Sequence, residues 1–241
     1  MNIIEWSQMS WNPVAGCTPI SMGCAHCYAL TRAQKLQYSG VKKYEDGFKL
    51  KVHPNLLNPD FNKYPPSRIF AGSMTDLFHD NIPLEIKRQV FIVIHNNPKH
   101  LFLVVTKRAE RVHEQRNHFS AIPNLILAVT VEHADYKHRI RLLQETNAIH
   151  KAVFFEPLLG DIGDVDLTGI QWAFVGGESG PGFREMDKSW VISLKDQCDR
   201  QNCTFIFKQW HGNPRGVNGC RLDGQIYNQI PTIDVITGNN I

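Results

Sequence analysis

Residues 101–108 of the chain read LFLVVTKR. Five apolar residues follow one another without the alternation of a strand that faces water on one side, and three polar residues come directly after them. A continuous apolar run of this length is typical of a strand that is buried on both faces of a parallel sheet. The polar residues predict that functional side chains lie where the strand stops.

The same pattern recurs along the chain, with helical patterns between the apolar runs. The other runs lie at residues 11–14, 68–71, 125–129, 152–155, 172–175 and 204–207. About seven such units predict an α/β protein with a partial or complete parallel (β/α) barrel. An open doubly wound sheet is the alternative, and in either fold the functional groups gather at the carboxyl ends of the strands.

Helices are expected between several of these runs. Residues 28–38 read as a helix, and Asp80 or Asn81 is expected to cap a second helix. A third helix follows Asp187, and its spacing places Cys198 on the buried stripe as a core residue.

The composition is compatible with one globular domain over residues 1–241. The chain is 42% hydrophobic, which is enough for one substantial core, and residues 41–67 read as a lid or excursion. The formal net charge of +3 permits an anionic partner without requiring one. We expect a cytoplasmic protein without a membrane partner, because the sequence shows neither a signal-peptide pattern nor an apolar run of membrane-spanning length.

Three of the six cysteines crowd into one short stretch, GCTPISMGCAHCYA at residues 16–29. In the cytoplasm such thiols are more often metal-bound, catalytic or buried than paired in disulfides. Cys17, Cys24 and Cys27 are one ligand short of a closed structural zinc site. They match a four-iron cluster in which one iron has no protein ligand and is free to chelate S-adenosylmethionine.

Two other uses of these cysteines remain open. A structural zinc site would take its fourth ligand from His26, His79 or Cys220. A thiol–disulfide pair of Cys24 and Cys27 has suitable spacing, but it leaves Cys17 without a role.

Polar and ionisable side chains also follow the ends of the other apolar runs. They are Ser73, Thr75 and Asp76 after 68–71, Lys107 and Arg108 after 101–105, Glu132 after 125–129, Glu156 after 152–155, Glu178 after 172–175, and Lys208 and Trp210 after 204–207. Taken singly, each has a simpler explanation: Glu132 or Asp80 could cap a helix, and the glycine-rich residues 176–182 could form a tight turn. In a barrel, however, all of them converge on one mouth.

The cysteine stretch resembles the radical S-adenosylmethionine superfamily, whose pattern is C-x3-C-x2-C after the first strand. This chain keeps the second half of that pattern, with His26 in the position of an aromatic residue, but residues 18–23 replace the three residues of the first half. The segments WNPVAGC, CAHCYA, GSMTDLFHD, TKR, EPLLG, VGGESGPG and FKQW are similar to those of an uncharacterised phage-borne family with a lengthened three-cysteine motif.

The resemblance implies a [4Fe-4S] cluster on Cys17, Cys24 and Cys27, and S-adenosyl-L-methionine that is cleaved to a 5′-deoxyadenosyl radical. Residues 72–76 take the place of the superfamily's Gly-Gly-Glu segment, whereas the Gly-Gly-Glu of this chain follows the sixth strand. The implied cofactor contacts are Ser73, Thr75, Asp76, Lys107, Arg108 and Glu132. The implied catalytic residues on the substrate side are Glu156, Glu178 and Lys208.

The expected partners follow from the same resemblance and from the basic and aromatic residues of the mouth. An external electron donor and a protein encoded nearby are implied. Lys107, Arg108, Lys208, Arg215 and Trp210 could form a basic, stacking surface for nucleic acid, or could serve only the carboxylate and adenine of the cofactor. We expect a nucleobase or nucleotide as the group that is modified or repaired. The alternative is a zinc- or cluster-containing module that binds nucleic acid or protein without radical chemistry.

Overall fold

Seven parallel strands form one sheet in the computed structural model, which describes residues 6–119 and 121–232. The two ends of the predicted single domain, residues 1–5 and 233–241, and residue 120 lie outside the described residues. The strands are β1 (Met9–Trp11), β4 (Arg68–Ala71), β5 (Leu101–Thr106), β6 (Leu125–Thr130), β7 (His150–Phe155), β8 (Trp172–Gly176) and β9 (Thr204–Gln209).

The order of these strands decides between the two predicted architectures. The sheet runs β1-β4-β5-β6-β7-β8-β9, so each strand lies beside the one before it and the order never reverses. A doubly wound sheet reverses its order at a switch point, whereas successive right-handed crossovers in one direction build a barrel wall. The structure is therefore a partial parallel (β/α) barrel, as predicted, and the doubly wound alternative is wrong.

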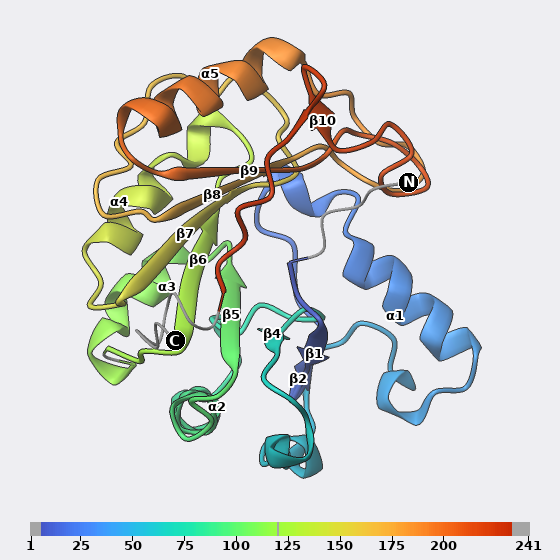
Figure 1. The fold of residues 1–241 in the computed structure, drawn as a ribbon. Helices are drawn as coiled ribbons and strands as arrows, with labels where there is room; N and C mark the ends of the chain where they lie inside the picture. Colours follow the sequence, from blue (N-terminus) through green and yellow to red (C-terminus); the bar gives the residue numbers. More distant parts are fainter. Residues whose placement is uncertain (1–5, 120, 233–241) are drawn as a thin grey trace.

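The sheet is accompanied by helices, four of which cover its outer side. They are α1 (Tyr28–Tyr38), α2 (Leu84–His95), α3 (Ala109–Glu114), α4 (His138–Gln144) and α5 (Lys188–Arg200). Figure 1 shows α2, α3, α4 and α5 following one another around the sheet, while α1 stands apart beyond β1. The connection from β7 to β8 has no helix; side-chain amides of Gln197 and Gln201 instead accept hydrogen bonds of 2.8 Å from the backbone of Val165 and Leu167.

Strands β5, β6 and β8 are almost entirely apolar because both of their faces are buried. The first strand was predicted at residues 11–14 but is Met9–Trp11, and its Ser10 is exposed. In β5, Phe102 and Val104 belong to the core between sheet and helices, while Leu101 and Leu103 belong to a second core on the inner face. The inner core also contains the stacked rings of Phe154 and Phe174, whose centroids lie 4.4 Å apart. Continuous apolar runs are what burial on both faces requires.

The predicted caps of two segments are wrong. Helix α2 begins at Leu84 with Pro83 at its N-cap, and no side chain caps it; Asp80 instead pairs with Arg108 and Arg111. Glu132 is fully buried and caps nothing. The helix predicted after Asp187 is confirmed, since its carboxylate accepts a hydrogen bond of 2.7 Å from the backbone N–H of Ser189.

Residues 41–67 pack against the first strand. They contain η2 (Lys42–Tyr44), β3 (Lys51–Val52), η3 (Pro54–Leu56) and η4 (Phe61–Lys63), and β3 pairs antiparallel with β2 (Val14–Ala15). Phe61 is 3% exposed, and its ring lies 5.5 Å from that of Trp11. The segment thus contributes to the main core, and a movement of its exposed parts as a lid stays a prediction.

The remaining short elements are η1 (Met22–Cys24), η5 (Arg116–His118), η6 (Ala134–Tyr136) and the antiparallel pair β10 (Arg221–Leu222) and β11 (Gln225–Ile226). Among the described residues, no helix has the length and apolar character needed to cross a membrane.

Candidate metal and active site

The three clustered cysteines lie on one loop, residues 16–27, between β2 and α1; we call it the cysteine loop. All three are half-buried and carry free thiols. The loop starts at Gly16, whose φ of +91° and whose closeness to Lys49 leave no room for a side chain: a Cβ would lie 2.3 Å from the Lys49 carbonyl oxygen. Thr75 holds this start in place by donating a hydrogen bond of 2.6 Å to the carbonyl oxygen of Gly16.

Glu132 contacts the middle of the cysteine loop. One of its carboxylate oxygens accepts a hydrogen bond from the Ser21 hydroxyl, and the other accepts one of 3.0 Å from Arg139. A Cβ at Gly23 would lie 2.9 Å from the same carboxylate, so the loop backbone rests directly on it. Because Glu132 is completely buried with both oxygens bound, a contact to a ribose would require it to release Ser21.

Glu178 holds the end of the cysteine loop that contains His26. It lies 2.8 Å from His26 Nδ1, and it accepts hydrogen bonds from the guanidinium and the backbone N–H of Arg184. Arg184 also donates to the carbonyl oxygen of Met22 at 3.1 Å. Burial alone would raise the pKa of Glu178, but the hydrogen bonds from Arg184 and His26 outweigh it and hold the pKa below its usual range.

Arg108 and His79 fix the part of the loop next to Cys17. Arg108 Nη2 donates to the carbonyl and hydroxyl oxygens of Thr18 at 3.1 and 3.0 Å. His79 Nδ1 accepts from the backbone N–H of Asn81 at 3.1 Å, which assigns the proton to Nε2, 2.9 Å from the Thr18 hydroxyl. Burial and the nearby Arg108 charge lower the pKa of His79, so this histidine is neutral at pH 7.

The surroundings of Cys17 raise the pKa of its free thiol, although they include the Arg108 cation. Burial, and then the charge of Asp76, raise the pKa of the free thiol, while the charge of Arg108 and a hydrogen bond from it act in the opposite direction. Arg108 Nε is buried and has no hydrogen-bond partner among the described residues. A metal-bound sulfur would supply that missing acceptor. By their chemistry, three free thiols on one loop are the ligand set of an iron–sulfur cluster.

The donors that a four-ligand zinc site would need are engaged elsewhere. His26 pairs with Glu178, His79 is bound to Thr18 and Asn81, and Cys220 is buried in the inner core. In residues 6–119 and 121–232, no three His, Cys, Asp or Glu side chains form a group that could hold a metal ion, and this holds for the three loop cysteines as well.

The predicted cofactor contacts after β4 and β5 divide into bound and free groups. Asp76 accepts hydrogen bonds from the Thr106 hydroxyl at 2.6 Å and from the backbone N–H of Lys107 at 3.0 Å, so it ties β4 to β5. Ser73 exchanges hydrogen bonds with the Asn12 side chain. Lys107 differs: within the described part of the chain, its ammonium group makes neither a hydrogen bond nor an ion pair. Of the two cations predicted to bind an anionic group, Lys107 is the one that is free.

A second group of predicted residues meets on the inner face of the barrel wall. Glu156 and Lys208 form an ion pair, and Gln209 donates a hydrogen bond of 2.7 Å to Glu156. Burial favours the neutral form of Glu156, but the Lys208 and Arg215 charges outweigh it and lower the pKa of Glu156. Lys208 Nζ lies 5.5 Å from the centroid of Phe154. The structure therefore brings Glu156 and Lys208 together, whereas Glu178 contacts the cysteine loop instead.

The glycine pair that precedes Glu178 has a structural function. A Cβ at Gly177 would lie 2.3 Å from the backbone nitrogen of His211, so β8 and the chain after β9 approach each other too closely for any side chain. Trp210 is also tied down, because its indole N–H donates to the carbonyl oxygen of Arg221 at 2.9 Å.

Sequence reasoning missed Ser21, Arg139 and Arg184, which complete the supports of the cysteine loop. Arg139 and Arg184 bind carboxylates that were expected to act on a ligand or substrate, and Ser21, although it lies within the cysteine motif, binds a carboxylate 111 residues away.

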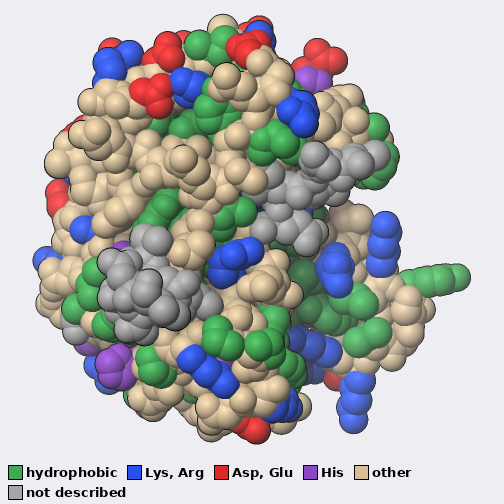
Figure 2. Space-filling view, in the orientation of Figure 1, with side chains coloured by type: hydrophobic (Ala, Val, Ile, Leu, Met, Phe, Trp, Pro, Cys, Tyr) green, Lys and Arg blue, Asp and Glu red, His purple; other side chains and the backbone are tan. Residues whose placement is uncertain are grey.

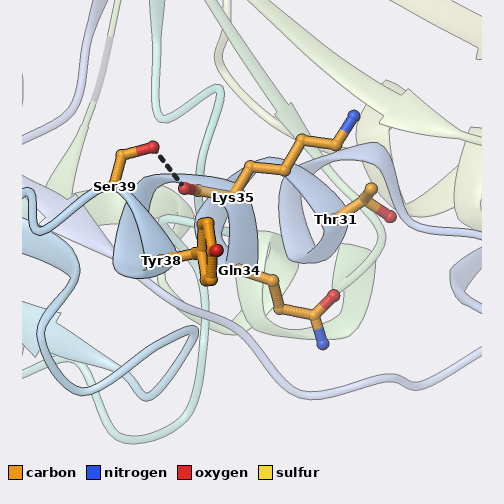
Figure 3. A pocket seen from close by; sticks show the side chains of 5 residues that line it. All are labelled: Thr31, Gln34, Lys35, Tyr38 and Ser39. Carbon is orange, nitrogen blue, oxygen red and sulfur yellow. Dashed lines mark hydrogen bonds between the residues drawn. The ribbon is translucent and has the colours of Figure 1, made fainter.

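A surface hollow lies away from these residues, on α1. Its lining side chains are Thr31, Gln34, Lys35, Tyr38 and Ser39. Figure 3 shows that all of them come from this one helix and its end. No predicted site residue lines the hollow.

Comparison with known proteins gives a family. The model of DUF5131, described as a protein of unknown function, matches residues 1–231. The chain belongs to the DUF5131 family. The match covers nearly the whole chain of this DUF5131 protein, and no curated protein matches it.

Two solved structures share a distant likeness with the DUF5131 protein. Both are spore photoproduct lyase with dinucleoside spore photoproduct, and one is a cysteine-to-alanine mutant. Their sequence identities are 12% and 10%, with TM-scores of 0.46 and 0.45. Each comparison covers 80% of this chain but 61% of the lyase, so the chain spans less than two thirds of the lyase's length. At this distance the likeness assigns no function.

Proposed function

We propose that this DUF5131 protein is an iron–sulfur enzyme of the radical S-adenosylmethionine type, with Cys17, Cys24 and Cys27 as the cluster ligands. One observation carries the proposal: three free thiols share one loop at the end of a partial parallel barrel. When bound, the cluster and S-adenosyl-L-methionine would supply one-electron chemistry and a carbon radical that abstracts hydrogen from a substrate.

The residues around the loop would hold the ligands in place. Glu132 and Glu178 fix its middle and its CxxC end, and Arg108 fixes Thr18 beside Cys17. Rigid support of this kind keeps the three sulfurs in one arrangement and limits access of water. Lys107, which has no partner among the residues that the structure describes, is the residue we assign to an anionic group of the cofactor.

The inner face of the barrel wall would bind the substrate. Glu156 presents an acceptor and Lys208 a donor beside the ring of Phe154. A nucleobase carries donors and acceptors around an aromatic ring, and such a mixed pair next to a phenyl group suits it. We therefore propose a nucleobase or nucleotide as the substrate, with Glu156 and Lys208 contacting it.

Cofactor cleavage tests the proposal. Anaerobically reconstituted protein, reduced with dithionite in the presence of S-adenosyl-L-methionine, should release 5′-deoxyadenosine, measured by chromatography and mass spectrometry. The Cys24→Ala variant should release none, whereas Cys198→Ala, which alters a buried core thiol, should retain release in the fraction that folds. Equal release by wild type and Cys24→Ala would contradict the proposal.

A further inference from the structure

The outward side of α1 is basic. The helix reads YALTRAQKLQY and contains no acidic residue. Its buried residues are Ala29 and Ala33, while Arg32, Lys35 and Tyr38 are exposed. We call Arg32, Lys35 and Tyr38, together with the exposed Lys42 and Lys49 of the following segment, the α1 surface.

The cations of this surface are not neutralised by the protein. Residues 28–51 contain six Lys or Arg and two Asp or Glu, and both acids, Glu45 and Asp46, bind Lys51 at 2.8 Å. Within the described residues, no hydrogen bond or ion pair is made by the side chains of Arg32, Lys35, Lys42 or Lys49. Figure 2 shows Lys and Arg side chains gathered over α1 and the segment after it.

Several cations on other helices are paired instead. On α5, Lys195 binds Asp199 at 2.6 Å, and on α3, Arg111 binds Glu114 at 2.7 Å. Among the described residues, four unpaired cations thus lie on α1 and the segment that follows it. A cluster of unpaired cations attracts a polyanion.

Tyr38 adds an exposed aromatic ring to these cations. A site that binds only phosphate groups would not need such a ring. Its side chain is 96% exposed, at the edge of the hollow that also includes Thr31, Gln34 and Lys35 (Figure 3). An aromatic ring exposed among cations is the combination by which proteins bind unpaired bases, which stack on the ring while phosphates contact Lys and Arg. A base pair within a duplex has no free face for such a ring.

We propose that the α1 surface binds a single strand of nucleic acid, with phosphates on Arg32, Lys35, Lys42 and Lys49 and a base stacked on Tyr38. Helix α1 has 11 residues and is about 16 Å long, and it begins directly after Cys27. A strand along it leads to the cysteine loop. Binding of the strand itself needs no cluster. That the strand carries the base to be modified rests on the proposed function.

Oligonucleotide binding tests this surface. The probe is a fluorescein-labelled 20-mer of single-stranded DNA, titrated with protein and followed by fluorescence anisotropy at several salt concentrations; the same sequence as RNA and as duplex DNA is compared. Four phosphate contacts predict that log K falls with log salt with a slope of roughly −3. Binding to the duplex should be weaker than to either single strand.

Matched variants localise the binding. Arg32→Gln with Lys35→Gln should reduce the steepness of the salt slope by roughly 1.4, because two phosphate contacts are lost. Tyr38→Ala should weaken binding roughly tenfold through lost stacking. The control is Arg141→Gln with Arg200→Gln, which removes the same charge from exposed positions of α4 and α5 and should leave binding within about twofold. Circular dichroism verifies that each variant is folded.

Three outcomes would overturn the proposal. Wild type could fail to bind any of the three probes at low salt; the α1 surface would then be a site for an acidic protein and not for nucleic acid. The α1 variants could bind as tightly as the control pair. Tyr38→Ala could leave single-strand binding unchanged. Each result is independent of the proposed function, because the protein without cluster is used. If the protein binds the strand but releases no 5′-deoxyadenosine, only the proposed enzymatic function is rejected.

Discussion

At the scale of single residues, two buried carboxylates determine how the cysteine loop is held. Glu178 accepts hydrogen bonds from Arg184 and contacts His26, and its side chain is 3% exposed. The Glu178→Gln variant keeps the shape but loses the charge. We expect the free energy of unfolding to fall by about 1.5–3 kcal/mol, the usual contribution of a hydrogen bond to a charged group. Urea denaturation measures it.

The neighbouring Glu185→Gln serves as the control, because Glu185 is exposed and makes no hydrogen bond within the described residues. Its free energy of unfolding should stay within about 0.5 kcal/mol of wild type. Equal stabilities of the Glu178 and Glu185 variants would mean that the Glu178 contacts do not hold the loop.

The same carboxylate predicts a pH dependence. The pKa of Glu178 is lower in the folded protein than the usual value of about 4.3 for an unfolded chain. Its stabilising contribution is therefore complete above that value and is lost as pH falls through the folded pKa. The stability difference between wild type and Glu178→Gln should be constant from about pH 5 to 7 and shrink below about pH 4. A constant difference down to pH 3 would contradict the depressed pKa.

Residue types and their order along the chain were enough to find the three cysteines and the polar strand ends, but not what those polar residues contact. Glu132 follows a strand and was expected to touch a ligand; it binds Ser21, which is 111 residues away. Separations of this size are invisible in a single sequence. Lys107 and Arg108 likewise look equivalent until the structure shows that Arg108 is occupied by Thr18 and Asp80.

At the scale of elements, the approach of β8 to the chain after β9 depends on Gly177. Replacement by Ala would place a methyl group 2.3 Å from the backbone nitrogen of His211, which cannot move away as a side chain would. We expect Gly177→Ala to lower the free energy of unfolding by about 3 kcal/mol. Thermal and urea unfolding measure this loss.

Gly40→Ala is the comparison for that variant. Gly40 has a φ of +71°, but a Cβ there would meet nothing within 4 Å. The cost should be that of the left-handed backbone alone, about 1 kcal/mol. If the two substitutions cost the same, close packing at Gly177 is not the reason for the glycine.

The central strands were predictable because burial on both faces requires a continuous apolar run; β1 has no such run, and its position was predicted wrongly. The ends of the helices were harder. Helix α2 starts at Leu84 without a side-chain cap, so the polar Asp80 and Asn81 were misleading signals. The helix-free connection before β8 depends on the amides of Gln197 and Gln201 from α5, which no local pattern reveals.

At the scale of the whole molecule, residues 41–67 are expected to unfold together with the sheet. Phe61 packs against Trp11 and Phe102 with ring centroids 5.5 and 5.4 Å away. The Phe61→Ala variant should lower the free energy of unfolding by about 3–5 kcal/mol and shift the entire transition, because the lost contacts belong to the main core. Fluorescence and circular dichroism should report the same midpoint.

Tyr64→Ala is the control in the same segment, since Tyr64 is 38% exposed. It should leave the midpoint nearly unchanged. If Phe61→Ala instead produced a separate early transition with the main midpoint unaltered, residues 41–67 would be an independent lid.

The sequence predicted the barrel only as one of two possible architectures, because a barrel and a doubly wound sheet share the same alternation of strands and helices. Only the sheet itself shows that the order never reverses. The packing of residues 41–67 on the first strand was not predictable, since few apolar residues interrupt its polar composition.

The most direct test of the three-cysteine cluster is the metal content of protein purified without oxygen. Iron, zinc and acid-labile sulfide should be measured per chain for wild type and Cys24→Ala. The account predicts about four iron and four sulfide per wild-type chain and their loss in the variant. About one zinc per chain, without iron or sulfide, would contradict it.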